Sequence, residues 1–304
     1  MPDFDIHILG CGSALPTTRH LPSSQIVNLR DKLYMIDCGE GTQLQMRYMR
    51  MKFSRLNHIF VTHLHGDHCF GLPGLISTLG MLGRNGDLFV YGPAEVGDYL
   101  RSMLDLFCKT LPFEVRFRAV NPCEHSLVME DRSVQVFSIP LKHRIPCCGY
   151  LFKEKPKEAH IVREMIDFYR VPVSCLKNIK QGADYTTADG TVVPNARLVR
   201  PADPPKRFAY CSDTTFAPDI IPLIEGVDLL YHEATFCEED AARAQETCHS
   251  TARQAAEIAR RAGVKRFVIG HFSARYASLS ALHGEAAEIY PNTVLGKEGM
   301  VISL

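Results

Sequence analysis

The residues best suited to chemistry lie in one short segment. Positions 62–68 read THLHGDH and place three imidazoles and a carboxylate close together: His63, His65, Asp67 and His68. Imidazole nitrogen and carboxylate oxygen are ligands that zinc and similar divalent metals accept. In an extended segment His63 and His65 point the same way, while Asp67 and His68 turn toward a second point. The spacing therefore favours two adjacent metal ions over one.

Neither chance clustering nor a structural zinc site accounts as well for this H-x-H-x-D-H run. Surface histidines cluster by chance, but chance does not explain such a run directly after the apolar stretch 59–62. A structural zinc site is more often built with cysteine thiolates. Two adjacent ions lower the pKa of a bound water to about 7 and neutralise charge on phosphate oxygens. The segment therefore predicts a two-metal hydrolase.

The elements that must position these residues are short apolar runs alternating with amphipathic stretches. Several runs end beside a residue capable of chemistry, among them Asp37, His63, His143, Asp213 and His271. Apolar periodicity predicts helices over 40–52, 72–82, 94–107, 161–169 and 251–262. Strands that come first in pairs and later alternate with helices predict an α/β fold, a four-layer αββα sandwich with two packed sheets between outer helices.

One stretch departs from this pattern. Residues 153–205 are rich in charge, proline and turn residues and contain one short helix candidate. We interpret them as an insertion, a protruding arm and loop within a single domain spanning 1–304.

Charge, cysteine content and hydropathy indicate which partners and which compartment to expect. The formal net charge is zero, so a polyanion would have to be held by local groups of basic residues, at 47–55 and 153–180. Each group taken alone is more simply a solvated face. The eleven cysteines have no C-x-x-C spacing and are expected to be reduced. There is no apolar run of membrane-spanning length, and residues 1–5 lack signal-peptide order, so we expect a cytoplasmic protein without a membrane partner.

The H-x-H-x-D-H run resembles the signature of the metallo-β-lactamase superfamily. This resemblance implies further metal ligands at His143, Asp213 and His271, each after a later strand. It assigns one Zn²⁺ to His63, His65, His143 and Asp213. It assigns a second to Asp67, His68, Asp213 and His271, so that Asp213 bridges the ions. Mn²⁺ or Mg²⁺ could replace zinc.

Further motifs resemble the ribonuclease Z family. They extend along the chain from Gly10 onward and read DCGEGTQ at 37–43, SDT at 212–214, HEATF at 232–236, HST at 249–251 and GHFSARY at 270–276. The resemblance implies a zinc-dependent endoribonuclease that removes the 3′ trailer of precursor tRNA. The products would be a 3′-hydroxyl on the tRNA and a 5′-phosphate on the trailer.

The same resemblance implies roles for residues around the metals. Asp67 would receive the proton of the attacking water, and His249 would protonate the leaving oxygen. His249 could instead be a neighbour of a helix start. Glu233 would orient a neighbouring histidine, although His232 and Glu233 could equally form a buried pair. Asp37 would support its loop and is not counted as a ligand.

The resemblance also implies that the arm grips the tRNA elbow and that the protein is a homodimer. Basic side chains suit a substrate recognised by shape. The glycine-proline turn usual in bacterial arms is absent, and residues 170–175 read RVPVSC. The helix expected at 40–52 offers apolar side chains for a dimer interface, but such residues are more often core.

An alternative function is hydrolysis of a small phosphodiester or other ester, for which an arm has no use. Nucleic-acid binding without catalysis is a second alternative, but no expected ligand is missing.

Overall fold

The computed structural model describes residues 4–304. Residues 1–3, part of the segment expected not to be a signal peptide, lie outside the described residues. The chain divides into two compact units: Glu154–Pro205 is one, and the chain up to Lys153 together with Lys206–Leu304 is the other. Among residues 4–304, every helix is too short or too polar to cross a bilayer.

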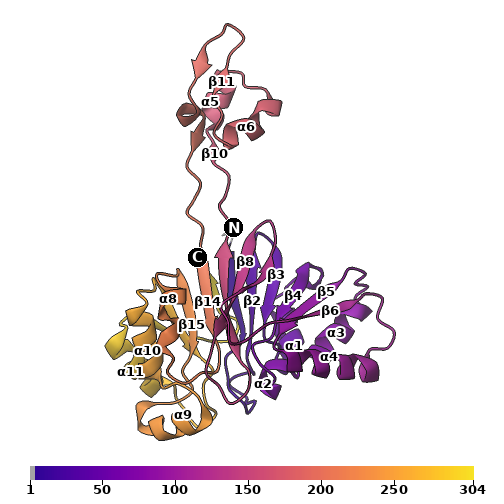
Figure 1. Cartoon of the computed structure of the whole chain (residues 1–304), viewed down its shortest axis with the longest axis vertical. Helices are drawn as coiled ribbons and strands as arrows, with labels where there is room; N and C mark the ends of the chain where they lie inside the picture. The colour runs from indigo at the N-terminus through magenta and orange to yellow at the C-terminus, as the bar shows by residue number, and fades with distance from the viewer. Residues whose placement is uncertain (1–3) are drawn as a thin grey trace. The chain divides into compact units, whose positions relative to one another are not determined.

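Two seven-stranded sheets form the larger unit (Figure 1). The first sheet has the order β18 (Val301–Ser303), β1 (Phe4–Gly10), β2 (Ser24–Leu29), β3 (Lys32–Ile36), β4 (Leu56–Phe60), β5 (Leu88–Gly92) and β6 (Val115–Ala119). The second has the order β17 (Thr293–Leu295), β16 (Phe267–Gly270), β15 (Leu229–Glu233), β14 (Arg207–Cys211), β9 (Cys148–Glu154), β8 (Val134–Pro140) and β7 (Leu127–Glu130). Each sheet mixes antiparallel and parallel pairs, with β3 to β6 parallel in the first and β14 to β17 parallel in the second.

Helices cover the outer face of each sheet. Those beside the first sheet are α1 (Thr42–Tyr48), α2 (Gly66–Cys69), α3 (Leu72–Met81) and α4 (Ala94–Phe107), with the 3-10 turn η1 (Phe53–Arg55). Those beside the second are α8 (Ile221–Ile224), α9 (Ala241–Thr247), α10 (Ala252–Arg261) and α11 (Ser280–Ile289), with η3 (Pro218–Ile220) and η4 (Glu238–Asp240). Figure 1 shows these two sets on opposite sides of the paired sheets. The predicted αββα sandwich is confirmed.

The sandwich is held together because strand residues alternate between two cores. In β3, Tyr34 and Ile36 face the core between the sheets, while Leu33 and Met35 belong to the core under α1, α3 and α4. Across the sheets, the Phe60 ring lies 5.2 Å from the Tyr150 ring and 5.5 Å from the Phe152 ring. Burying side chains of this size stabilises the fold by roughly 1.5–3 kcal/mol each.

The predicted helices of this unit form, with shorter bounds at some ends. The helix predicted at 40–52 is α1, which ends at Tyr48 because Arg50 adopts a left-handed φ of 54°. The helix predicted at 251–262 begins at Ala252, since the Thr251 side chain accepts the Gln254 N–H and completes a capping box. The capping box fixes the start of α10 directly after the segment that carries His249.

The smaller unit has its own apolar cluster, formed by Ile166, Val171, Ile179, Val193 and Leu198. Its elements are β10 (His160–Ile161), α5 (Arg163–Phe168), η2 (Val173–Cys175), α6 (Leu176–Lys180), β11 (Tyr185–Thr186), β12 (Val192–Val193), α7 (Asn195–Leu198) and β13 (Val199–Arg200). The expectation of a single short helix here was wrong, because α6 and α7 are each too short for apolar periodicity to reveal.

Candidate metal centre

The candidate ligands lie at the ends of four strands. His63 and His65 follow β4, and the chain then turns into α2, whose first turn carries Asp67 and His68. The remaining three ligands follow β8, β14 and β16 and are His143, Asp213 and His271. The two sheets thereby support the segments that carry every predicted ligand.

Four of these side chains form one set, which we call the His63 group: His63, His65, His143 and Asp213. His65 Nδ1 lies 3.0 Å from His63 Nε2 and 3.3 Å from His143 Nε2. Asp213 Oδ2 lies 3.4 Å from His63 Nε2 and 3.8 Å from His143 Nε2. These atoms can surround one small cation.

A second set, the His68 group, contains Asp67, His68 and His271 and again Asp213. His271 Nε2 lies 3.3 Å from His68 Nε2 and 3.4 Å from Asp67 Oδ2. Asp213 Oδ1 lies 3.4 Å from His68 Nε2 and 3.2 Å from His271 Nε2. The two oxygens of Asp213 therefore face different groups.

Hydrogen bonds fix the orientation of the imidazoles. Nδ1 of His143 donates to the Cys248 carbonyl at 2.9 Å, which leaves Nε2 free to ligate. Nδ1 of His68 donates to Asp37 at 2.8 Å. Partners of this kind hold the tautomer and the ring angle of metal-binding histidines.

Hydroxyl groups orient the other two imidazoles. Thr235 Oγ1 lies 2.9 Å from His271 Nδ1, and Thr62 Oγ1 lies 3.0 Å from His63 Nδ1. Both hydroxyls donate to buried carboxylates, so each accepts from its histidine. The two threonines were not singled out from the sequence, because a threonine beside a strand end carries no distinctive signal.

Asp37 lies outside both groups and bonds to the segment that carries the first ligands. It accepts the Thr62 amide at 2.8 Å as well as His68 Nδ1. Its φ is 56°, and His271 has a φ of 60°. Left-handed conformations cost of order 1–3 kcal/mol each and cluster at functional sites.

Burial and neighbouring charges set the protonation states of the candidate ligands. Burial, together with His63 and His143, lowers the pKa of His65 to about 4. Burial also lowers the pKa of His143 to about 4. These two imidazoles are therefore neutral near pH 7, the form that ligates a metal. Burial opposes ionisation of Asp67, but the adjacent His68 and His271 hold its pKa well below the usual range.

His249 lies beside both groups, with Nδ1 4.0 Å from Asp213 Oδ2 and 2.9 Å from Glu233 Oε1. Burial alone would lower its pKa, but Glu233 raises the pKa to about 9. Thr251 provides the helix cap of α10, so His249 lies two residues before the cap and its side chain faces Glu233 instead. Glu233 also accepts the amides of Thr214 and Ser250.

A cavity of about 430 Å³ opens over this centre. It is lined by Ala14, Pro16, Pro22, Glu40, His65, Gly66, Asp67, Phe70, Arg144, Asp213, His249 and His271. Arg144 is an exposed cation that was not singled out from the sequence, although it directly follows His143.

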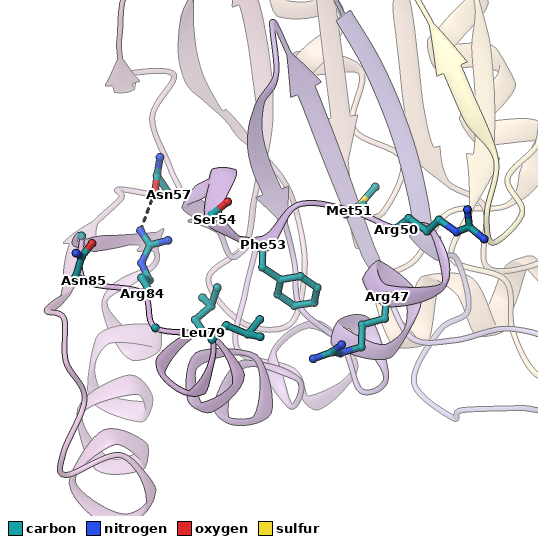
Figure 2. Close-up of a pocket in the computed structure, with 12 residues that line it drawn as sticks. Arg47, Arg50, Met51, Phe53, Ser54, Asn57, Leu79, Arg84 and Asn85 are labelled. Atoms are coloured by element: carbon teal, nitrogen blue, oxygen red, sulfur yellow. Dashed lines mark hydrogen bonds between the residues drawn. The ribbon is translucent and has the colours of Figure 1, made fainter.

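A larger cavity of about 640 Å³ lies between η1, the end of α1 and the end of α3. Figure 2 shows the Phe53 ring between Arg47 and Leu79, with Arg84 bonded to Asn57. Its lining residues include no histidine, cysteine or carboxylate, so it lacks groups for acid-base or metal chemistry. The smaller cavity is the candidate site.

The donor set suits a divalent metal of the zinc class. Tetrahedral bonds of about 2.0–2.2 Å to nitrogen and oxygen place ligand atoms about 3.3–3.6 Å apart. Most separations within the His63 and His68 groups lie close to that range.

Comparison with known proteins decides the family. A profile described as "Beta-lactamase superfamily domain" matches residues 196–272, and one described as "Anti-Pycsar protein Apyc1" matches residues 4–100. A protein named ribonuclease Z from Parabacteroides distasonis is 72% identical over 304 residues and covers 100% of both chains. The chain belongs to the ribonuclease Z family. A ribonuclease Z from Bacteroides fragilis is 60% identical, again over 100% of both chains.

Solved structures agree with this membership. The short form of human tRNase Z has a TM-score of 0.71 at 26% identity and covers 98% of each chain. YhfI from Bacillus subtilis, a metallo-beta-lactamase fold protein, has a TM-score of 0.69 at 18% identity over 99% of each chain, which shows the fold alone. The chain is thus a hydrolytic endoribonuclease of the metallo-β-lactamase superfamily, and its fold implies binding of a divalent metal. The predicted family, fold class and enzyme class are confirmed.

Proposed function

We propose that this enzyme removes the 3′ trailer of precursor tRNA with two zinc ions, leaving a 3′-hydroxyl on the tRNA and a 5′-phosphate on the trailer. Family membership makes the chain a tRNA 3′-processing endoribonuclease; the proposal adds the metals and the residue roles. The observation that carries it is Asp213, whose Oδ2 faces His63 at 3.4 Å while its Oδ1 faces His271 at 3.2 Å. A bridging carboxylate suits two adjacent cations.

The His63 group would hold one ion and the His68 group the other. When bound, two such ions lower the pKa of water and neutralise charge on the phosphate oxygens. The five imidazoles favour zinc, because Mg²⁺ prefers oxygen ligands, whereas Mn²⁺ could substitute for zinc.

Asp67 and His249 would move the protons. Asp67 is ionised, and its Oδ2 accepts the Ala14 amide at 2.7 Å, so the carboxylate is held in place to receive a proton from water. Nδ1 of His249 is bonded to Glu233, which leaves Nε2 to protonate the leaving 3′-oxygen. Glu233 would act by orienting His249 and favouring its charged form.

The arm, Glu154–Pro205, would hold the body of the tRNA. Several of its cations already have acidic partners: Lys157 pairs with Glu154, Lys180 with Glu158 and Arg163 with Asp167. Arg170 takes a left-handed φ of 49° after α5, where the family's glycine-proline turn is absent. The exposed Phe168 and Val173 add apolar surface for contact with RNA. Near the centre, the exposed Arg144 would contact phosphate.

We further propose a homodimer in the cytoplasm, the compartment expected for precursor tRNA and for eleven free cysteines. Of the apolar residues in the predicted interface helix, Met46 is buried, whereas Leu44 and Tyr48 are 52% and 72% exposed. Exposed apolar side chains in one short helix support self-association. Sedimentation of wild type and Tyr48→Glu tests this: a shift of the variant toward monomer is expected, and a monomeric wild type would contradict it.

The activity is tested with a 3′-extended tRNA transcript. Wild type and His65→Ala are each assayed after zinc loading and after chelation, and the product ends are mapped. We expect one metal-dependent cut after the unpaired base that precedes the trailer, and no cut by the variant. Intact tRNA together with rapid hydrolysis of a small phosphodiester would instead support the alternative ester hydrolase.

A further inference from the structure

A third cluster of metal-ligating side chains lies outside the catalytic groups. It contains Cys11, which follows β1, His20 in the next loop, and Glu298 just before β18. Cys11 Sγ lies 3.6 Å from His20 Nδ1 and 3.4 Å from Glu298 Oε1. His20 Nδ1 lies 3.2 Å from Glu298 Oε2. Three residues distant in sequence thus bring a sulfur, a nitrogen and an oxygen together.

These separations match the edges of a tetrahedral site. Zinc bonds of about 2.3 Å to sulfur and about 2.0–2.2 Å to nitrogen or oxygen hold the ligand atoms about 3.3–3.7 Å apart. The His63 group has the same pattern, with 3.3 Å between His143 Nε2 and His65 Nδ1. The Gly296 carbonyl oxygen, 3.4 Å from Cys11 Sγ, or a water can complete four ligands.

Charge and access are also suitable. A Cys11 thiolate and a Glu298 carboxylate together carry two negative charges, which one divalent cation would balance. Without a cation, burial and the neighbouring Glu298 raise the pKa of the Cys11 thiol well above its usual value, so the thiol stays protonated. Cys11 is fully buried, whereas the side chains of His20 and Glu298 are 20% and 15% exposed, which leaves an ion a route from solvent.

We propose that Cys11, His20 and Glu298 bind a third divalent cation of the zinc class, separate from the two catalytic ions. The alternative is a metal-free hydrogen-bonded cluster, in which the thiol and the imidazole both donate to Glu298. The two states differ in one observable respect: only the metal site contains a thiolate bound to a cation.

The third ion would position the catalytic loop, a consequence that rests on the proposed function. The cluster anchors both ends of the segment 11–21, since Glu298 Oε1 also accepts the Leu21 amide at 2.9 Å. Within that segment Ala14, at a left-handed φ of 34°, donates its amide to Asp67. Fixing the segment fixes this donor, so His20, Cys11 and Glu298 are positioning residues for Asp67.

The test is cobalt substitution of the full-length protein. Bound Co²⁺ gives a thiolate-to-metal charge-transfer band in the near ultraviolet, and neither catalytic group contains a cysteine. We expect the band in wild type, its loss in Cys11→Ser, and its retention in Cys237→Ser, which changes another buried cysteine. Zinc content should fall by one equivalent per chain in Cys11→Ser. A wild-type protein without the band, or a band that survives in Cys11→Ser, would overturn the proposal.

Two further variants keep the test decisive. Glu298→Gln retains the thiol and the overall shape, and we expect weaker cobalt binding at this site even if Cys11→Ser fails to fold. His65→Ala disables the His63 group, and we expect the band to persist. A wild-type protein that shows the band but does not cut tRNA would refute the proposed function while leaving the third site intact.

Discussion

Removal of His249 should slow cleavage because the leaving 3′-oxygen loses its proton donor. With a pKa of about 9, the imidazole is about 99% protonated at pH 7. Its bond to Glu233 fixes Nδ1, so the Nε2 proton is the one available to substrate. General acid catalysis is typically worth about 10²–10⁴-fold, which corresponds to about 3–5 kcal/mol of activation free energy. We expect a loss of this size in kcat for His249→Ala.

The assay compares two substrates that differ in one atom. In the second, the bridging 3′-oxygen at the cleavage site is replaced by sulfur, which leaves readily because a thiol has a pKa of about 8.5. His249→Ala should cut this substrate within about tenfold of wild type. Zinc content serves as the control, since His249 belongs to neither the His63 nor the His68 group. An equal loss on both substrates would refute the proton-donor role.

Further predictions concern metal affinity, acid stability, core packing and substrate binding. Asp37→Ala removes the partner of His68 Nδ1 and should weaken binding of one zinc about 10–100-fold in a chelator competition. Burial lowers the pKa of His58 from 6.5 to about 4, so between these pH values the unfolded state binds more protons than the folded state. The free energy of unfolding of wild type should therefore fall by about 3 kcal/mol as the pH drops through this range. Urea titrations should show a smaller loss for His58→Phe. Phe60→Ala should lower the free energy of unfolding by about 3–5 kcal/mol. Replacing residues 156–203 by a short linker should raise KM for precursor tRNA but leave hydrolysis of bis(p-nitrophenyl) phosphate unchanged.

Features with a local pattern could be predicted from the sequence. The run His63 to His68 carries four potential metal ligands in one segment, so its chemistry is evident before any fold is known. The helix at 94–107 is predicted with its observed bounds because its apolar spacing is regular over fourteen residues.

Features that depend on distant pairing could not be predicted in this way. His143 is oriented by the Cys248 carbonyl, 105 positions away, and His271 by Thr235, 36 positions away. A backbone carbonyl or a threonine carries no signal of such a partner, since only the fold brings the two together. The cluster of Cys11, His20 and Glu298 was not predicted from the sequence for the same reason, because Glu298 lies 278 positions beyond His20.

The bounds of the short helices and the turn within the arm could not be predicted from the local sequence pattern either. Its helices α6 and α7 have five and four residues, less than the length over which apolar spacing distinguishes a helix from a turn. Arg170 adopts a left-handed φ, a conformation that favours glycine, so an arginine at this position does not predict the turn.

In the proposed mechanism Asp213 bridges two catalytic ions. Crystals of the zinc-loaded protein, measured at the zinc absorption edge, locate the ions by anomalous scattering independently of any assay. We expect two peaks, one within the His63 group and one within the His68 group, each bonded to a different oxygen of Asp213. A single peak, or two peaks of which neither contacts Asp213, would contradict it.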